Sequence, residues 1–541
     1  MASESVRWVA PLLLVLLAVP VVHAAPGGAG FELACPPVVA ASPAQPPTCP
    51  LYVLDQEDLF GQPDLVADAR DPSVLAFSAM HGGAGLHPLP SGQPPSPRSR
   101  DASVHQPHTT FVTRDGGSTW HDYPYDPPTA ILPASTLPGV PVRAGQAREA
   151  YGEDNAMALD GQGRVALAAL YASRDAGATA STPYRYTVAL WREGKPAAGM
   201  DYFNGLTVLP LPADSRADSL HLTYVPDADA LVALWRQEDA PRRVTLAGAW
   251  ANGTSGAWTP LDANLTPQGC ASLSRPFAEG ASLVFACGSR LVSLDPRTSR
   301  ASDLGALPLP DLGQVGLAPL DGPGRYAAWA AGVQDGHPSL VVSFRARNGS
   351  AWSAPRDVGP DVQPPGLGSQ GALLEARATA AAYAPGSGSL HLVFETRRAT
   401  DAQPGIAKTL VALGPEGVRA SLDLALGQVR RVDVSPTATG LGEDVYDDLH
   451  DSLVVRRDPA GGAPRELLAY GDYGFVRFAE VREHGFAPPV VPLAAQAPPV
   501  PAAAPGGIPV LVGIPAGVLA GTAMARVAMA RRQQTVEVRD E

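Results

Sequence analysis

The chain has 541 residues, including 55 glycines and 57 prolines, and its net charge is −13 at pH 7. A chain of this length can bury a large core, and its acidic balance excludes nucleic-acid binding, which needs a basic surface. Only two of its 40 basic residues are lysines, Lys195 and Lys408, and this skew is typical of a GC-rich genome. High proline content therefore indicates disorder only where prolines cluster.

The first 24 residues have the pattern of a secretory signal peptide. Arg7 supplies the positive start, PLLLVLLAVPVV the apolar core, and Val22-His23-Ala24 a small-residue cleavage site. An uncleaved membrane anchor is the alternative, but the apolar run is short for one. We expect export, with an N-terminal extension over residues 25–49.

Four cysteines fall into two local pairs. Export permits disulfides, and an even number of cysteines allows all of them to pair. Cys35–Cys49 with Cys270–Cys287 is the pairing that needs the least loop closure. A zinc site is disfavoured because neither pair has the close C-x₂-C spacing of a structural site. We expect two disulfides, no metal and no cofactor.

Between residues 50 and 486 the dominant pattern is an apolar strand, a polar turn and a second apolar strand. The clearest examples are MALDGQGRVALAALY (157–171), LTYVPDADALVALW (222–235) and AAYAPGSGSLHLVFE (381–395). This pattern predicts β-hairpins, and long stretches of 3.6-residue periodicity are scarce. The sequence therefore predicts an all-β domain over 50–486.

Three turns run from Asp or Asn through glycine into tryptophan: DGGSTW (115–120), NGTSGAW (252–258) and NGSAW (348–352). Their tryptophans are separated by multiples of about 46 or 47 residues, in the range of propeller-blade repeats. We expect a β-propeller of about seven four-stranded blades, with six or eight as alternatives, because single blades cannot bury both faces. The expected blade cores lie near 51–125, 145–208, 218–262, 268–303, 323–358, 370–415 and 430–486.

The first of these turns resembles the Asp-box of the sialidase and BNR-repeat families. The matching residues are Thr113, Asp115, Gly117, Thr119 and Trp120. The other two turns are imperfect copies, in which Asn252 or Asn348 occupies the Asp position. The resemblance implies a sialidase-like β-propeller, in which this turn joins the third and fourth strands of a blade, away from the active site. Its Asp accepts backbone hydrogen bonds and its Trp packs on the blade. We expect these residues to be structural.

The resemblance does not extend to a sialidase active site. Sialidases need three arginines around the substrate carboxylate, a Tyr–Glu nucleophile pair and an acidic proton donor. The Arg-Ile-Pro element that precedes the first Asp-box in the family is absent, and only Arg70, Arg98 and Arg100 stand ahead of the box after the signal peptide. Serine-hydrolase, phosphate-loop and His-Glu-x-x-His motifs are also absent. The sequence therefore names no catalytic residue.

Four other groups of polar residues have functional alternatives, and for each we favour a structural role. GDYG (471–474) would line the channel through Asp472 and Tyr473, or form a strand-edge turn. FETRR (394–398) pairs Glu395 with Arg397 on one strand face, as an ion pair or a catalytic pair. The carboxylate cluster EDVYDDLHD (443–451) would hold a hard cation or form a solvated loop. The four histidines of HGGAGLH (81–87) and HQPH (105–108) would hold a transition metal or lie in a surface loop.

The C-terminal region has the pattern of a stalk and an anchor. Residues 487–505 are a Pro/Ala-rich spacer. Residues 506–525 carry no charge, are long enough to cross a bilayer and are followed by arginines, which places the following side in the cytoplasm. We expect a transmembrane helix over 506–530 and a cytoplasmic tail over 531–541; a buried terminal strand or helix is the alternative.

This layout predicts a monomeric single-pass protein of the cell membrane with an extracellular ectodomain. We expect a surface module that binds a glycan or another protein without catalysis. The alternatives are a sialidase-like glycoside hydrolase with a nonstandard site at the propeller mouth, and a receptor ectodomain like the Asp-box propellers of sortilin-type receptors. Asn252, Asn264 and Asn348 each begin an Asn-x-Ser/Thr sequon, which indicates exposed turns if the host glycosylates.

Overall fold

The structure is a computed structural model, and its chain divides into two units, residues 1–493 and 494–541. The second unit lies outside the residues that the structure describes. The described residues are 29–34, 52–53, 59–68, 70–81, 104–105, 108–115, 121–123, 148–175, 185–193, 203–212, 215–239, 243–252, 257–261, 270–345, 351–362, 372–398, 405–428, 451–457, 463–472 and 475–486.

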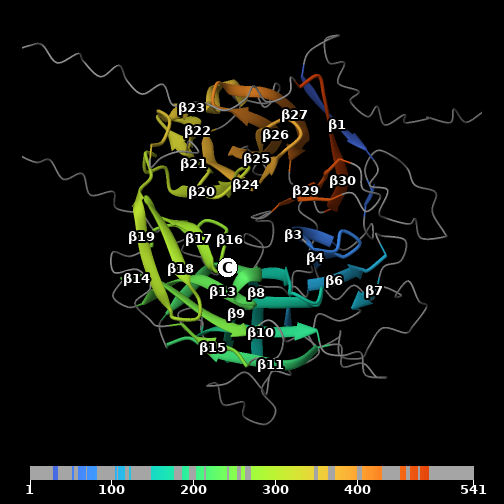
Figure 1. Cartoon of the computed structure of the whole chain (residues 1–541), viewed down its shortest axis with the longest axis vertical. Coiled ribbons are helices and arrows are strands. Elements are labelled where there is room, and N and C mark those ends of the chain that lie inside the picture. Colours follow the sequence, from blue (N-terminus) through green and yellow to red (C-terminus); the bar gives the residue numbers. More distant parts are fainter. Residues whose placement is uncertain are drawn as a thin grey trace, which may run out of the picture. The chain divides into compact units, whose positions relative to one another are not determined.

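The described part of the chain is all β apart from two short 3₁₀ helices, and its strands form seven sheets (Figure 1). The first sheet contains β3 (Leu59–Ala67), β4 (Leu75–His81), β6 (His108–Thr113) and β7 (His121–Tyr123). The second contains β8 (Arg148–Leu159), β9 (Val165–Asp175), β10 (Arg185–Glu193) and β11 (Phe203–Pro210), with β5 (Val104–His105) parallel to β8. The prediction of an all-β domain is confirmed.

The next three sheets have four antiparallel strands each, in chain order. The third contains β12 (Arg216–Val225), β13 (Ala230–Asp239), β14 (Arg243–Asn252) and β15 (Thr259–Pro260), with the 3₁₀ helix η2 (Pro226–Ala228) between β12 and β13. The fourth contains β16 (Phe277–Glu279), β17 (Ser282–Cys287), β18 (Arg290–Asp295) and β19 (Arg300–Ala306). The fifth contains β20 (Gln314–Pro319), β21 (Tyr326–Gln334), β22 (His337–Phe344) and β23 (Arg356–Asp357), followed by η3 (Gly359–Val362).

The last two sheets complete the first unit. The sixth contains β24 (Leu373–Ala384), β25 (Ser389–Arg398), β26 (Gly405–Gly414) and β27 (Gly417–Gln428). The seventh contains β28 (Ser452–Arg456), β29 (Arg465–Asp472), β30 (Phe475–His484), β1 (Gly30–Ala34) and β2 (Tyr52–Val53). The seven sheets agree in number with the seven predicted groups of strands, but β2 and β5, which lie in the first predicted group, belong to the seventh and second sheets.

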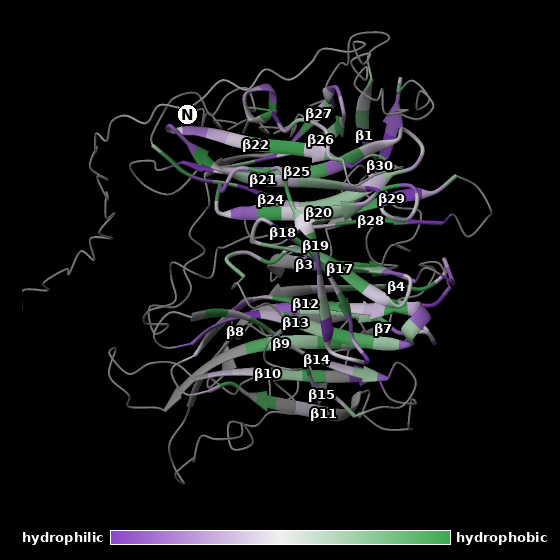
Figure 2. Cartoon of the chain, turned by 60° about the vertical axis from the view of Figure 1, so that its left-hand side comes forward, coloured by the Kyte–Doolittle hydropathy of each residue, from purple (hydrophilic) through white to green (hydrophobic). Residues whose placement is uncertain are grey.

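The second strand of a sheet is buried on both faces, and this explains its continuous apolar sequence. In β13, Val232 and Leu234 face the fourth sheet, whereas Leu231, Ala233 and Trp235 pack against the second. The strands β9, β17, β21 and β25 repeat this division between two neighbouring sheets. Figure 2 shows hydrophobic colour along strands and hydrophilic colour at many turns.

Each sheet contacts the next along the chain, and the seventh contacts the first. At this last junction Leu65 N donates a 2.9 Å hydrogen bond to Ser452 Oγ, which donates to Leu65 O at 3.1 Å. Arg456 Nη1 also donates to Pro72 O. This set of contacts is consistent with a propeller.

The seventh sheet is built from both ends of the unit, which the sequence analysis did not predict. Strand β1 pairs antiparallel with β30 from Gly30↔His484 to Ala34↔Glu480, and Phe31 is buried beside β25 and β29. Part of the segment expected as an N-terminal extension (25–49) is therefore a strand of the sheet.

Among the described residues no helix is long and apolar enough to cross a membrane. The predicted signal peptide (1–24), stalk (487–505), transmembrane helix (506–530) and tail (531–541) lie outside the described residues. They stay predictions.

Candidate functional site

A pocket of about 250 Å³ lies where the first strands of four consecutive sheets come together. Its walls are the C-terminal ends of β3, β8 and β12 and residues 275–278 at the start of β16. Most of the lining residues are apolar, and Arg70 and Arg275 supply the cationic groups. A largely apolar hollow with a few placed charges is the usual form of a small-ligand site.

Arg275 reaches the pocket from a segment that runs along β17. Ser274 N donates to Ala286 O at 3.0 Å, and Ser274 Oγ accepts from Ala286 N at 2.8 Å. The Arg275 guanidinium forms a 3.1 Å ion pair with Asp64 Oδ1, yet 48% of its side chain is exposed. Arg275 is therefore oriented by a carboxylate and keeps exposed surface.

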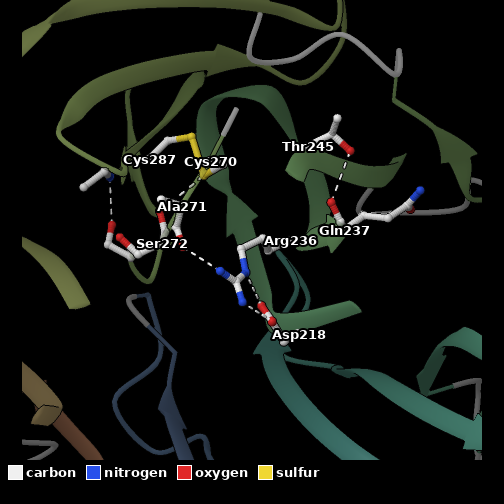
Figure 3. Close-up of a disulfide and its surroundings, with 10 residues drawn as sticks. Asp218, Arg236, Gln237, Thr245, Cys270, Ala271, Ser272 and Cys287 are labelled. Carbon is white, nitrogen blue, oxygen red and sulfur yellow. Dashed lines mark hydrogen bonds and ion pairs between the residues drawn. A yellow bond between two sulfur atoms is a disulfide. The ribbon is translucent and has the colours of Figure 1, made fainter. Parts of the chain in front are cut away.

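A disulfide holds the same segment in place. Cys270 precedes it and is bonded to Cys287, the last residue of β17 (Figure 3). Nearby, Arg236 Nη1 of β13 donates to Ala271 O at 2.5 Å, and its Nε donates to Asp218 Oδ1 at 2.6 Å. The predicted Cys270–Cys287 pair is confirmed, and Cys35 and Cys49 lie outside the described residues.

Arg70 and Tyr224 also contribute polar groups to the lining. Arg70 Nη1 donates to Gly161 O at 3.1 Å, and its guanidinium lies 5.8 Å from the centre of the Tyr224 ring. The Tyr224 hydroxyl donates to Asp229 Oδ1 at 2.8 Å. Burial and Asp229 together raise the pKa of Tyr224 to about 12. A tyrosine nucleophile must lose its proton, so Tyr224 is unsuited to that role at neutral pH.

The two acidic residues of the pocket lining, Asp68 and Asp160, stabilise the turns in which they lie. Asp68 Oδ1 accepts the backbone N–H of Arg70 at 2.7 Å and that of Asp71 at 3.2 Å. Asp160 Oδ1 accepts the N–H groups of Gln162 at 2.8 Å and Arg164 at 3.0 Å, and its Oδ2 pairs with the Arg164 side chain. Such Asp–backbone bonds stabilise tight turns. Both acids are therefore placed to shape the rim of the pocket.

The Asp-box turn lies between the third and fourth strands of the first sheet, β6 and β7. Thr113 Oγ1 donates to Asp115 Oδ1 at 2.9 Å within it. The two imperfect copies also lie between the third and fourth strands of their sheets, between β14 and β15 and between β22 and β23. Their tryptophans, Trp258 and Trp352, pack on apolar clusters. Gly117, Thr119 and Trp120 lie outside the described residues.

Glu395 of the FETRR motif is fully buried in an ionic cluster. Its Oε1 accepts hydrogen bonds from Arg377 Nη2 at 2.7 Å and Arg397 Nε at 3.0 Å, and its Oε2 lies 3.4 Å from Lys408 Nζ. Burial raises the pKa of Glu395, but the three cations more than offset it and hold the pKa below its ordinary value. Three cationic side chains thus converge here on the chain's own carboxylate.

The other polar groups of the sequence are only partly described. In GDYG (471–474), Gly471 and Asp472 are the last residues of β29, and Asp472 pairs with Phe475 of β30; Tyr473 lies outside the described residues. In EDVYDDLHD (443–451) only Asp451 is described, and it is buried beside Lys408. The side chains of the four histidines lie outside the described residues.

No sequence motif marks the pocket. Arg70 was noted only as one of the arginines ahead of the Asp-box, and Tyr224 lies in a predicted hairpin as an ordinary strand residue. Arg275 follows Cys270 by a few residues, so the predicted local disulfide was the one signal that this segment is fixed in place.

No protein-family model and no curated protein matches the chain. The solved structures that resemble it include a Trypanosoma rangeli sialidase in complex with sialic acid, with 11% identity and a TM-score of 0.33, covering 84% of this chain and 59% of that one. The Hadza microbial sialidase Hz136 has 11% identity and a TM-score of 0.35, covering 78% and 65%.

An exo-β-1,3-galactanase from Clostridium thermocellum has 13% identity and a TM-score of 0.26, covering 48% of this chain and 58% of that one. The chain spans 59% and 65% of the lengths of the two sialidases. All these TM-scores are low, and the likeness assigns no function to this chain.

Proposed function

We propose that residues 29–486 form a seven-bladed β-propeller that binds a glycan or protein ligand outside the cell and leaves it unchanged. Seven sheets in chain order, contacts between each sheet and the next, and contacts between the seventh and first sheets support the propeller. The pocket at the ends of β3, β8 and β12 supports the binding role.

The proposal that the pocket has no catalytic activity rests on one observation. Both acidic residues of its lining accept hydrogen bonds from the backbone of their own turns. Asp68 and Asp160 each accept two backbone N–H groups. A general acid or base must instead be free to exchange its proton with a substrate. Arg70 and Arg275 are suited to hold an anionic group, and the aromatic and apolar lining to hold the rest of the ligand.

Arrays of anionic and neutral glycans and of acidic peptides, probed with the full chain in detergent, test this proposal. We expect binding of anionic members and a roughly tenfold or greater loss of affinity in Arg275→Ala, because a charge-assisted hydrogen bond is removed. Arg290→Ala is the matched control, since Arg290 lies outside the pocket lining and pairs with exposed Asp303. Release of sugar from fluorogenic glycosides, abolished by Arg275→Ala, would show a hydrolase instead.

We also propose that residues 506–530 anchor this module to the cell membrane as a single span, with residues 531–541 inside. The uncharged segment and the arginines after it support this orientation. Fractionation of cells that express the full chain, or a chain ending at Ala504, tests the anchor. We expect only the full chain in the membrane fraction; equal partitioning of the two chains would contradict the proposal.

A further inference from the structure

Lys408 occupies an unusual place for a lysine. It is one of only two lysines in the chain, and its side chain is 1% exposed. It lies in β26, next to Glu395 of β25, which in turn pairs with Arg377 of β24. Arginine supplies nearly every other cation of this protein, so the buried position combines a rare residue with a place where charge is costly.

The Lys408 amine is held against a buried aspartate. Nζ lies 2.8 Å from Asp451 Oδ1, and the Asp451 side chain is 0% exposed. The Thr379 hydroxyl donates to the other oxygen, Oδ2, and the Asp451 backbone N–H donates to Thr379 O at 3.4 Å. The carboxyl group is therefore fixed in position, with a hydrogen-bond donor on the oxygen that does not face the amine.

Glu395 completes a triad around the amine. Its Oε1 is bonded to both arginines, and its Oε2 faces Lys408 Nζ at 3.4 Å. Arg377, Arg397 and Lys408 hold the pKa of this carboxylate below its ordinary value, so Glu395 releases a proton readily and carries one only in transit. Amine, acceptor carboxyl and proton carrier thus lie within one buried cluster.

We propose that Lys408 and Asp451 become joined by an intramolecular amide bond, with Glu395 carrying the proton. Glu395 Oε2 takes a proton from the ammonium group and passes it to Asp451 Oδ1, and the freed lone pair of Nζ attacks Cγ of the neutral carboxyl group. The Thr379 hydroxyl stabilises the charge that develops on Oδ2. The C–Oδ1 bond then breaks, and Oδ1 leaves as water with the proton that Glu395 carried to it and a second proton from nitrogen. One ammonium and one carboxylate give one amide and one water, and no oxidant or cofactor is consumed.

Two physical effects favour this product. Fixed, adjacent groups react as if at a very high effective concentration, which replaces the activation that amide formation needs in solution. The product also exchanges a buried ion pair for a neutral amide, and so removes the desolvation cost of both charges. A guanidinium is always protonated and cannot serve as this nucleophile, which gives a reason for lysine at this position.

Peptide mapping of the full chain tests the bond directly. Trypsin does not cut after an acylated lysine, so residues 399–419 should remain uncut at Lys408 and be linked to residues 432–456, which contain Asp451. The linked pair should weigh one water less than the two peptides together, and it should survive reduction. Recovery of the two regions as separate peptides, with cleavage after Lys408, would overturn the proposal.

Amine labelling of the denatured chain gives a second readout. We expect Lys195 to be labelled and Lys408 to be unreactive, with Lys195 as the internal control because it is the other lysine. Labelling of both lysines would contradict the bond. Lys408→Arg should lack the linked peptide.

The role of Glu395 is tested by two substitutions. Glu395→Gln should give unlinked peptides, and Glu395→Asp, which keeps a carboxylate, should give the linked pair in part. A linked pair in Glu395→Gln at the wild-type amount would overturn the assignment of Glu395 as proton carrier.

Discussion

Two interfaces between neighbouring sheets are filled by different kinds of side chain. Between the third and fourth sheets the contact is apolar, through residues such as Leu234, Leu283 and Phe285, and it includes the Cys270–Cys287 disulfide. Between the sixth and seventh sheets an apolar cluster is accompanied by buried charges: the Glu395 cluster, and His391 with two glutamates.

The two interfaces differ in what they require of a side chain. The apolar interface requires a suitable volume, whereas the charged interface requires a particular residue type. Apolar contacts are non-directional, so a side chain of similar volume serves nearly as well. A buried charge, in contrast, must meet its partner at the right place, because an unpaired one is destabilising by several kcal/mol. The junction between the sixth and seventh sheets should therefore tolerate less substitution.

The largest expected effect is at the charged interface. Glu395→Ala leaves Arg377 and Arg397 without their shared carboxylate, and should lower the free energy of unfolding by about 3–5 kcal/mol. Denaturant melts measure this. Glu416→Ala is the control, since it removes a half-exposed partner of Arg419 and should change stability by less than about 1 kcal/mol. Equal losses in the two variants would remove the distinction between buried and exposed pairs.

Near the apolar interface, the Cys270–Cys287 disulfide should contribute strongly to the free energy of unfolding. Replacing Cys270 and Cys287 together by alanine opens a loop with a sequence separation of 17, which should cost about 3 kcal/mol. Melts of the double variant, compared with wild-type protein under reducing and oxidising conditions, measure the loss. A double variant as stable as oxidised wild type would show that packing and hydrogen bonds alone hold the segment after Cys270 against β17.

The charged interface should also respond to pH. Burial lowers the pKa of His391, but Glu466 and Glu483 more than offset it and raise the pKa to about 9. Because the folded value lies above the unfolded value of about 6.5, this contribution is complete below that pH and disappears as pH rises towards 9. It should amount to roughly 1–3 kcal/mol.

Stability measured from pH 6 to 10, with His391→Gln as comparison, isolates this contribution. The variant should lack the extra loss of stability that wild type shows between these limits. Parallel curves for the two proteins would mean that His391 does not bind its proton more tightly in the folded chain.

The smallest effect is expected from a substitution that conserves volume at the apolar interface. Leu283→Met should cost less than about 1.5 kcal/mol, because a thioether of similar size fills the same fully buried space. Denaturant melts beside Glu395→Ala compare the two interfaces directly. A loss as large as that of Glu395→Ala would show that the apolar interface is equally selective.

The sequence predicted the strands better than it predicted the groups that meet between them. The turns of MALDGQGRVALAALY, LTYVPDADALVALW and AAYAPGSGSLHLVFE correspond to the β8–β9, β12–β13 and β24–β25 connections, because hairpins are determined by neighbouring residues. Arg70 and Arg275 line one pocket from different sheets, and no local pattern records that proximity. The pairing of β1 with β30 was missed for the same reason: a short strand sequence does not name its partner.

The pairing of β1 with β30 has a consequence for the order of folding. Among the described strands, β1 is synthesised first and its partner β30 last. Until β30 emerges, β1 has no partner strand, so it must stay unpaired while the intervening sheets form. Contacts so distant in sequence form slowly, because the whole intervening chain must be ordered first. A nascent chain arrested before residue 475 should therefore leave residues 30–34 open to protease, and release of the full chain should protect them.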